Sequence, residues 1–351
     1  MQQTLSASYY IRRFLRRQFV RKKFSVRAFV ILLLLARTIL KGDRLRKKNE
    51  KRFQTSIPPI CILSVTSTCN LSCKGCYAIN HSSADVLNDS DIEKIIREAT
   101  GLGIYLFIIS GGEPLMHENL LQILSRYPKA IFLIFTNGLL INSKHINSFK
   151  RNRHIFPVVS FEGNKNFNDF RRGKGSGSAI ENSLKVLSEN NLIYGFSSMA
   201  IPGNVDYIIS KSYFDKMESY GTTFGFIIDY IPSGNNVNHA LVLSDDELAR
   251  KKEELLKRRR DSNNFVFNLP IDESLFGHCG AAGKLLIHIN AAGQVSPCTF
   301  NTVSKDNIKN STLIDILKSG FFKEFRIQMD RNGKINGRCS MHEKKEELCS
   351  I

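Results

Sequence analysis

The stretch Ile60–Tyr77, ICILSVTSTCNLSCKGCY, decides the fold of this chain. Its first six residues, Ile60–Val65, are apolar and favour β structure, so we expect a buried strand. The loop that leaves this strand carries Cys69, Cys73 and Cys76 in the spacing C-x3-C-x2-C. Three thiolates on one loop can ligate three irons of a four-iron cluster. The fourth iron is then open to a small molecule that carries amino and carboxylate groups.

A structural zinc site is the alternative interpretation of these cysteines. Structural zinc normally takes four ligands in two pairs, and this triplet has no fourth ligand nearby. Gly75 permits a tight turn among the sulfurs. The chain has eight cysteines and no visible cleavable secretory signal. We therefore expect the thiols to stay reduced and to ligate metal rather than to form disulfides.

The cysteine loop resembles the signature of the radical S-adenosylmethionine (radical SAM) superfamily, and the resemblance continues beyond it. A second expected strand, Ile104–Ser110, ends in Gly111, Gly112 and Glu113. In the family, the equivalent strand end contacts the methionine amino group of SAM. The glycines allow close backbone approach, and Glu113 can accept from an ammonium group. Tyr77 follows the last cysteine, where the family usually has an aromatic residue beside the adenine.

A third motif, Ser160-Phe161-Glu162-Gly163, resembles the S-x-D-G strand end of family members that modify peptides and metabolites. Glu162 replaces the usual Asp. The resemblance implies that Ser160 and Glu162 bind the cofactor. Arg171 and Arg172 follow, and an Arg in relatives pairs with the cofactor carboxylate through its bidentate fork. Arg172 is our candidate, although the sequence does not distinguish it from Arg171, and an ordinary surface loop is the alternative for this stretch.

Strands and helices alternate along the middle of the chain. The expected strands are Ile60–Val65, Ile104–Ser110, Ile131–Thr136, Phe156–Phe161, Ile193–Ala200 and Phe224–Ile231. The expected helices are Ser90–Gly101, Leu115–Ser125, Ser143–Phe149, Ala179–Asn190 and Tyr207–Tyr220. Such alternation implies a parallel sheet with right-handed crossovers, so we predict an α/β fold, a partial (β/α)6 TIM-like barrel. The cysteines and the motifs above fall at C-terminal strand ends, where such barrels place their active sites.

Two further positions have two interpretations each. Asp229 and Tyr230 end the sixth expected strand, where they either face the substrate or serve packing and capping. Cys61 lies inside the first strand, and we expect a small core residue rather than a ligand. Residues 244–262 predict a charged helix that leads into the C-terminal part.

A second group of cysteines lies near the C-terminus. Residues 284–298 predict a β-hairpin, whose ends would bring Cys279 and Cys298 together. Their pattern, C-x13-G-x4-C, resembles the opening of SPASM and shorter twitch domains, the auxiliary-cluster extensions of radical SAM enzymes. Only Cys339 and Cys349 remain after it, so the resemblance implies at most one auxiliary [4Fe-4S] cluster, ligated by these four cysteines. A single structural zinc on the same thiolates is the alternative.

The positive charge of the chain is concentrated at its N-terminus. The formal net charge is +18, and residues 1–52 contain sixteen Lys and Arg but only two acidic residues. The rest of the chain is nearly neutral, whereas a nucleic-acid-binding surface spreads over the folded body, so we expect no nucleic-acid partner. The apolar run Val26–Leu40 is shorter than the ~20 residues of a membrane span.

The aromatic residues of this arm recur at spacings that share one helical side: Tyr10, Phe14, Phe19 and Phe24. Together with the apolar run and the cations, they predict a basic amphipathic helix on an anionic membrane surface. A helix packed on the catalytic domain is the alternative. Residues 41–55 are expected to form a charged linker.

We therefore expect three segments: residues 1–55 as arm and linker, 56–262 as radical SAM barrel, and 263–351 as SPASM/twitch-like domain. The resemblance implies an enzyme that cleaves SAM at a [4Fe-4S] cluster with electrons from a flavodoxin- or ferredoxin-type donor. The substrate stays open between a peptide or protein, a lipid or other amphiphile, and a small molecule. A peptide is the first interpretation, membrane-associated chemistry on a lipid the second, and a zinc-stabilised, non-enzymatic interaction protein the third. The expected location is cytoplasmic, peripheral at the inner face of the membrane.

Overall fold

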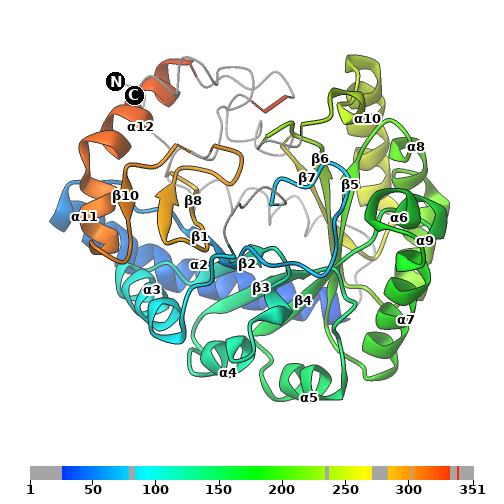
Figure 1. The fold of residues 1–351 in the computed structure, drawn as a ribbon, viewed down its shortest axis with the longest axis horizontal. Helices are drawn as coiled ribbons and strands as arrows, with labels where there is room; N and C mark the ends of the chain where they lie inside the picture. Colours follow the sequence, from blue (N-terminus) through cyan, green and yellow to red (C-terminus); the bar gives the residue numbers. More distant parts are fainter. Residues whose placement is uncertain are drawn as a thin grey trace.

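The centre of the fold is one ten-stranded sheet that curves into an open barrel with helices on its outer side (Figure 1). The computed structural model describes residues 26–78, 84–233, 237–270, 284–301, 303–332 and 338–339. The strand order is β10-β9-β8-β1-β2-β3-β4-β5-β6-β7. Strands β1 to β7 pair in parallel, and β8 adds to β1 in parallel on the other side. Strands β9 and β10 continue the sheet in antiparallel fashion.

The barrel elements alternate as follows. The strands are β1 (Ile60–Thr66), β2 (Leu106–Gly111), β3 (Ile131–Thr136), β4 (Ile155–Ser160), β5 (Gly195–Ala200), β6 (Phe224–Asp229) and β7 (Phe265–Leu269). The helices are α2 (Val26–Phe53), α3 (Asp89–Leu102), η1 (Pro114–Met116), α4 (Leu120–Ser125), α5 (Ser143–Arg151), α6 (Lys165–Arg172), α7 (Ser176–Glu189), α8 (Val205–Ile208), α9 (Lys211–Ser219), η2 (His239–Leu241) and α10 (Asp245–Asp261). The C-terminal part adds β8 (Leu286–Ile289), β9 (Gln294–Ser296), β10 (Asp306–Asn307), α11 (Leu313–Lys318) and α12 (Gly320–Asn332).

The predicted α/β fold with a parallel sheet is confirmed, and so is the hairpin of β8 and β9. The sheet has two more parallel strands than the six expected, β7 and β8, and a helix lies at α6 where a loop was the alternative. The single helix expected over Tyr207–Tyr220 is two helices, α8 and α9. The break is local, because the Ser210 side chain accepts from the backbone N–H of Tyr213 and begins a new helix there.

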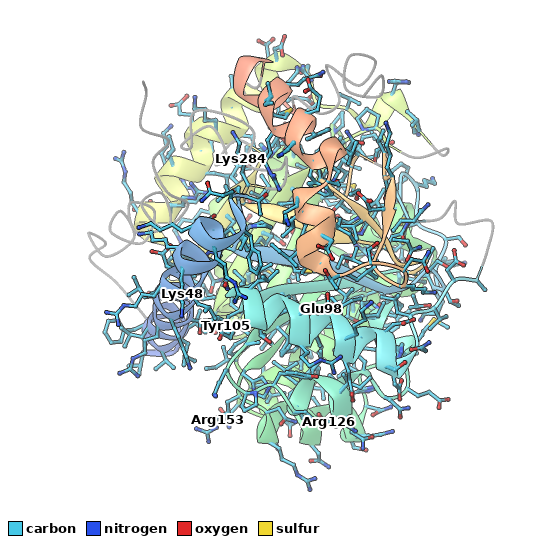
Figure 2. All side chains as sticks on the ribbon, turned by 90° about the vertical axis from the view of Figure 1, so that its left-hand side faces the viewer. Lys48, Glu98, Tyr105, Arg126, Arg153 and Lys284 are labelled. Carbon is cyan, nitrogen blue, oxygen red and sulfur yellow. The ribbon has the colours of Figure 1, made fainter. Side chains whose placement is uncertain are left out.

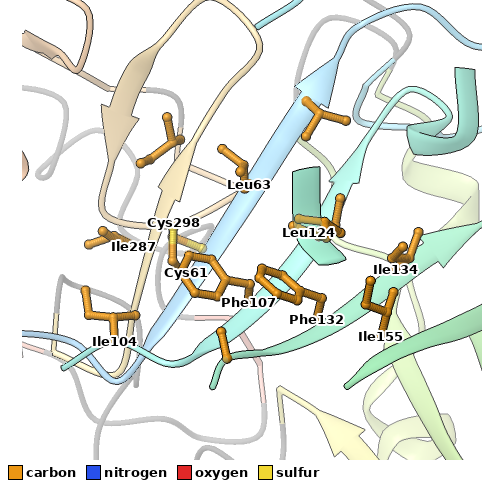
Figure 3. Packing of buried hydrophobic residues seen from close by; sticks show 14 of the residues in the cluster. Cys61, Leu63, Ile104, Phe107, Leu124, Phe132, Ile134, Ile155, Ile287 and Cys298 are labelled. Carbon is orange, nitrogen blue, oxygen red and sulfur yellow. The ribbon is translucent and has the colours of Figure 1, made fainter. Parts of the chain in front are cut away.

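The outward faces of the strands form the main core against the helices. Alternate residues of each strand, such as Cys61 and Leu63 on β1, are fully buried in this layer (Figure 3). Phe107 on β2 stacks on Phe132 on β3, with ring centroids 5.1 Å apart. Cys61 is therefore a core residue, as expected.

Residues 41–55, expected as a charged linker, instead continue α2 as far as Phe53. The expectation is wrong because α2 lies beside α3 (Figure 2), and polar side chains of this stretch are buried there. Arg46 donates to the carbonyl of Gly103 at 3.3 Å, and Asn49 donates to the carbonyl of Gly101 at 3.1 Å. These bonds satisfy carbonyl groups that the end of a helix leaves without intrahelical donors.

The apolar part of α2 crosses the N-terminal ends of the barrel strands. Ile31 is buried in a cluster with Ile131, Phe224 and Phe265, each of which is the first residue of its strand. Leu34, Leu35 and Ala36 pack against the same cluster. α2 therefore closes the lumen at the end of the barrel opposite the cysteine loop. For this part of the apolar run, the structure agrees with the alternative interpretation, a helix packed on the catalytic domain.

The opposite side of α2 is exposed. It carries the apolar side chains Val26, Phe29, Val30, Leu33 and Leu40, which are between 39% and 79% exposed. No helix among the described ranges is long and apolar enough to cross a bilayer. The expected aromatic side between Tyr10 and Phe24 lies outside the described residues.

Candidate active site

The cysteine loop leaves β1 at the C-terminal edge of the sheet. Cys69 is exposed, Cys76 is half-buried and Cys73 is buried. Gly75 adopts φ = +69°, a left-handed conformation that favours glycine. A Cβ there would also lie 2.7 Å from the ring of Tyr230, at the end of β6. The expected tight turn is therefore present, and it packs against Tyr230, which follows β6.

The glycines at the end of β2 bring two backbone segments into direct contact. Gly112 donates its N–H to the carbonyl of Thr66 at 2.7 Å, and Glu113 donates to the carbonyl of Thr68 at 2.9 Å. A Cβ on Gly112 would lie 2.1 Å from the Thr68 oxygen, and one on Gly111 would lie 2.2 Å from the Thr66 oxygen. Only glycine fits at both positions. The motif thus supports the segment that leads into Cys69.

Glu113 points into the protein and joins the ends of β2 and β3. Its carboxylate accepts from Thr136 Oγ1 at 2.7 Å, from the N–H of Asn137 at 2.7 Å and from the N–H of Leu115 at 3.1 Å. Burial raises the pKa of Glu113, although these hydrogen bonds oppose that change. The Asn137 side chain also donates to Asn70 in the cysteine loop at 2.7 Å. The contact of Glu113 with the SAM ammonium group stays a prediction.

Glu162 holds two arginines beside the cysteine loop. Its Oε1 accepts from Arg171 at 2.5 Å and from Nη2 of Arg172 at 2.6 Å, and its Oε2 accepts from the N–H of Met199 at 3.0 Å. Burial alone would raise the pKa of Glu162, but the two guanidinium groups outweigh it and hold that pKa below its usual range. Two cations on one carboxylate leave a buried positive charge. The backbone N–H of Lys74 donates to the carbonyl of Arg171 at 2.8 Å, and this bond attaches the cysteine loop to α6.

The thiols of the loop are close enough to influence one another. Burial raises the pKa of Cys69 to about 11, and the neighbouring Cys73 and Cys76 add to the increase. Burial also raises the pKa of Cys73, whereas Arg172 and Arg171 lower it. Arg172 is therefore the cation that both faces the thiols and binds Glu162 twice.

This donor set fits a four-iron cluster. Three thiols on one loop supply three ligands, and the buried positive charge beside Cys73 offsets the negative charge that thiolates bring. Across the part of the chain that the structure describes, no three His, Cys, Asp or Glu side chains gather around a single metal ion. A four-iron cluster does not require such a gathering, because each sulfur binds a different iron.

Two other cofactor candidates lie at the same edge. Ser160 ends β4 and shares a hydrogen bond with Ser197 on β5 at 3.2 Å. Tyr77 is half-buried and packs edge-on against Phe300 with centroids 5.9 Å apart. Their contacts to SAM stay predictions.

The C-terminal cysteines are only partly within the described residues. Cys298 is buried just after β9, and Cys339 lines a cavity of about 40 Å³ with Asp229 and Tyr230. Cys279 and Cys349 lie outside the described ranges, so the auxiliary ligand set stays a prediction. Asp229 accepts from the fully buried Lys251, which also donates to Asn268 at 2.8 Å.

Family comparisons match both cysteine regions. The Radical SAM superfamily model matches residues 63–207, and the SPASM iron–sulfur cluster-binding domain matches residues 279–349. This chain belongs to the radical SAM superfamily. It carries a SPASM domain, and the families it matches bind [4Fe-4S] clusters and SAM.

Relatives of this radical SAM enzyme have different substrates. GTP 3′,8-cyclase of Aquifex aeolicus is 27% identical over 308 residues, which cover 78% of this chain and 93% of the relative. The sporulation killing factor maturation protein SkfB of Bacillus subtilis is 22% identical over 302 residues, covering 82% of this chain and 71% of the relative. The crystal structure of Streptococcus suis SuiB shares the fold with a TM-score of 0.67 at 19% identity, covering 79% of this chain and 69% of that chain.

The structure gives Asn70 and Asn137 a role that the sequence did not predict, because together they tie the cysteine loop to β3. Arg171, the sequence alternative to Arg172, supplies both a guanidinium and a backbone carbonyl. Asn137 directly follows a strand, which was the available signal. Asn70 had no signal beyond its place between two cysteines.

Replacing Gly112 with Ala tests the support of the cysteine loop. The added Cβ clashes with the Thr68 carbonyl, so we expect the loop to shift and cleavage of SAM to fall at least tenfold. The measurement is 5′-deoxyadenosine formed under reducing, anaerobic conditions, together with iron content. Gly101→Ala is the matched control, because a Cβ there has no neighbour within 4 Å. Equal activity of the two variants would contradict the role of Gly112.

Proposed function

We propose that this radical SAM enzyme modifies a peptide or protein. The observation that carries the proposal is similarity over 82% of the chain to a protein named for maturation of a sporulation killing factor. The fold is shared with SuiB, which has also been crystallised with its precursor peptide SuiA.

The residues of the site have distinct roles in this proposal. Cys69, Cys73 and Cys76 hold the cluster that binds SAM, and Arg172, fixed by Glu162, faces the SAM carboxylate. The chemistry supplied by the bound cluster and SAM is reductive cleavage to a 5′-deoxyadenosyl radical that abstracts hydrogen. A flavodoxin- or ferredoxin-type protein donates the electron. Cys279, Cys298, Cys339 and Cys349 hold one auxiliary cluster.

The part of the lumen next to α2 suits radical chemistry because it is apolar. Phe226 belongs to this buried cluster, with its ring 5.2 Å from Phe135 and 4.9 Å from Phe267. Side chains from α2 close this lumen at the N-terminal strand ends. Water is thereby kept from the end of the barrel behind the site, where it would otherwise quench or divert a reactive intermediate.

A nucleotide substrate, as the name of the Aquifex relative indicates for that protein, fits the described site less well. A triphosphate needs several cations that are free to bind it. Among the described residues at the strand ends, the buried cations have carboxylate partners: Arg171 and Arg172 bind Glu162, and Lys251 binds Asp229. These pairs leave little charge for a polyphosphate.

The substrate class can be tested with fractions of a cell extract. The enzyme is incubated anaerobically with SAM, a reductant and either the small-peptide fraction or the lipid fraction, and 5′-deoxyadenosine is measured above the substrate-free rate. We expect the peptide fraction to stimulate formation several-fold, and protease treatment of that fraction to abolish the effect. Stimulation by the lipid fraction alone would contradict the proposal.

We further propose that the exposed side of α2 binds an anionic membrane surface. Apolar side chains on this side, among them Phe29 and Leu33, lie beside the exposed cations Arg37, Lys41 and Arg44. Apolar residues that insert at the headgroup level and cations that meet anionic lipid are the two components of interfacial binding. The opposite end of the strands carries the cysteine loop, roughly 20 Å away for strands of six residues. Membrane binding through α2 would thus point the site away from the lipid, which favours a peptide substrate.

Sedimentation with liposomes tests the membrane proposal. We expect Phe29→Ser combined with Leu33→Ser to lower binding to vesicles with anionic lipid at least fivefold, because two inserting side chains are lost. Vesicles of neutral lipid should bind weakly in both cases. The control replaces Leu256 and Ile327, which are similarly exposed elsewhere, with Ser. Unchanged binding of the α2 variant would refute the assignment.

A further inference from the structure

A row of polar side chains crosses the inner face of the sheet between the two cysteine regions. It consists of Ser110 on β2, Ser64 on β1, His288 on β8 and Ser296 on β9. Ser64 Oγ lies 3.2 Å from Ser110 Oγ and 2.9 Å from His288 Nε2. His288 Nδ1 lies 3.2 Å from Ser296 Oγ. All four side chains are buried.

The strand register explains why these side chains meet. Ser64 is the partner of Ser110 across β1 and β2, and His288 is the partner of Ser296 across β8 and β9. The neighbouring residues along each strand, such as Leu63 and Ile289, face the outer core instead. One polar residue on each of four adjacent strands therefore points into the lumen, whose other side is lined by phenylalanines.

Each end of the row reaches a cysteine region. At one end, the Ser110 side chain acts on the hydroxyl of Tyr77, the residue after Cys76, and opposes the increase in its pKa that burial causes. At the other end, Ser296 Oγ donates to the carbonyl of Cys298 at 3.1 Å. Only the imidazole offers two polar atoms on opposite sides, so His288 joins the two halves of the row.

We propose that His288 is a positioning residue that fixes the hairpin carrying Cys298 relative to the first cysteine loop and thereby sets the reduction potential of the auxiliary cluster. Hydrogen bonds behind a ligand orient it and tune the metal centre. The route from His288 through Ser296 ends on the Cys298 carbonyl, and the Cys298 sulfur accepts from the N–H of Phe300 at 3.4 Å. Phe300 in turn contacts Tyr77, so hairpin and loop are joined twice. The proposal rests on the SPASM domain and is independent of the substrate.

The test isolates the auxiliary cluster in the full chain by replacing Cys69, Cys73 and Cys76 with Ala. In this background, wild-type His288, His288→Leu and His288→Gln are compared by iron content and by redox titration monitored with EPR. We expect His288→Leu to shift the midpoint potential and the EPR signal, and His288→Gln, which keeps a donor and an acceptor, to restore them in part. His154→Leu is the control, since the described contacts of His154, a hydrogen bond to the Leu124 carbonyl and an edge-on contact with Phe132, involve no residue of the row.

Loss of auxiliary iron in His288→Leu, with a circular dichroism spectrum like that of His154→Leu, would also support the proposal. If His288→Leu does not fold, Ser64→Ala removes one bond of the row with a smaller change and is measured in the same way. An unchanged potential, EPR signal and iron content in the folded variant would overturn the proposal.

Discussion

The contact between two backbones at the C-terminal edge of the sheet is the constraint on which the site depends. Gly111 and Gly112 at the end of β2 lie so close to Thr66 and Thr68 that neither position has room for a Cβ. This contact fixes the path of the chain into Cys69. It also places Glu113 beneath the loop, where its carboxylate binds the end of β3. The cysteines are therefore held by adjacent strands rather than by their own loop alone.

The site also depends on how buried charged side chains are paired. Glu162 is fully buried and binds Arg171 and Arg172, so the surplus positive charge lies beside Cys73. At the other side of the barrel mouth, Asp229 and Lys251 form a neutral pair. The two buried cations beside Cys73 thus lie where an anionic cluster and a carboxylate are expected to bind.

The sequence predicted the fold well because strands and helices are local patterns, and it placed the cysteine loop correctly at the end of β1. Six parallel strands and the C-x3-C-x2-C loop are visible in consecutive residues. The charged stretch 41–55 was misread because its composition is polar, whereas burial of Arg46 and Asn49 depends on the end of α3, about fifty residues away. The row of hydrogen bonds around His288 could not be predicted from the sequence either, because its members are far apart in the chain and meet only through strand register. The auxiliary ligands Cys279 and Cys349 stay predictions, because they lie outside the described residues.

The most direct test of the central claim replaces Cys69, Cys73 and Cys76 together with Ala in anaerobically reconstituted enzyme. We predict that iron falls from about eight to about four atoms per chain, as one of two four-iron clusters is lost. Formation of 5′-deoxyadenosine should disappear. Cys61→Ala, a change at the buried core cysteine, should keep both clusters and activity. Continued cleavage of SAM by the triple variant would contradict the assignment of these cysteines to the catalytic cluster.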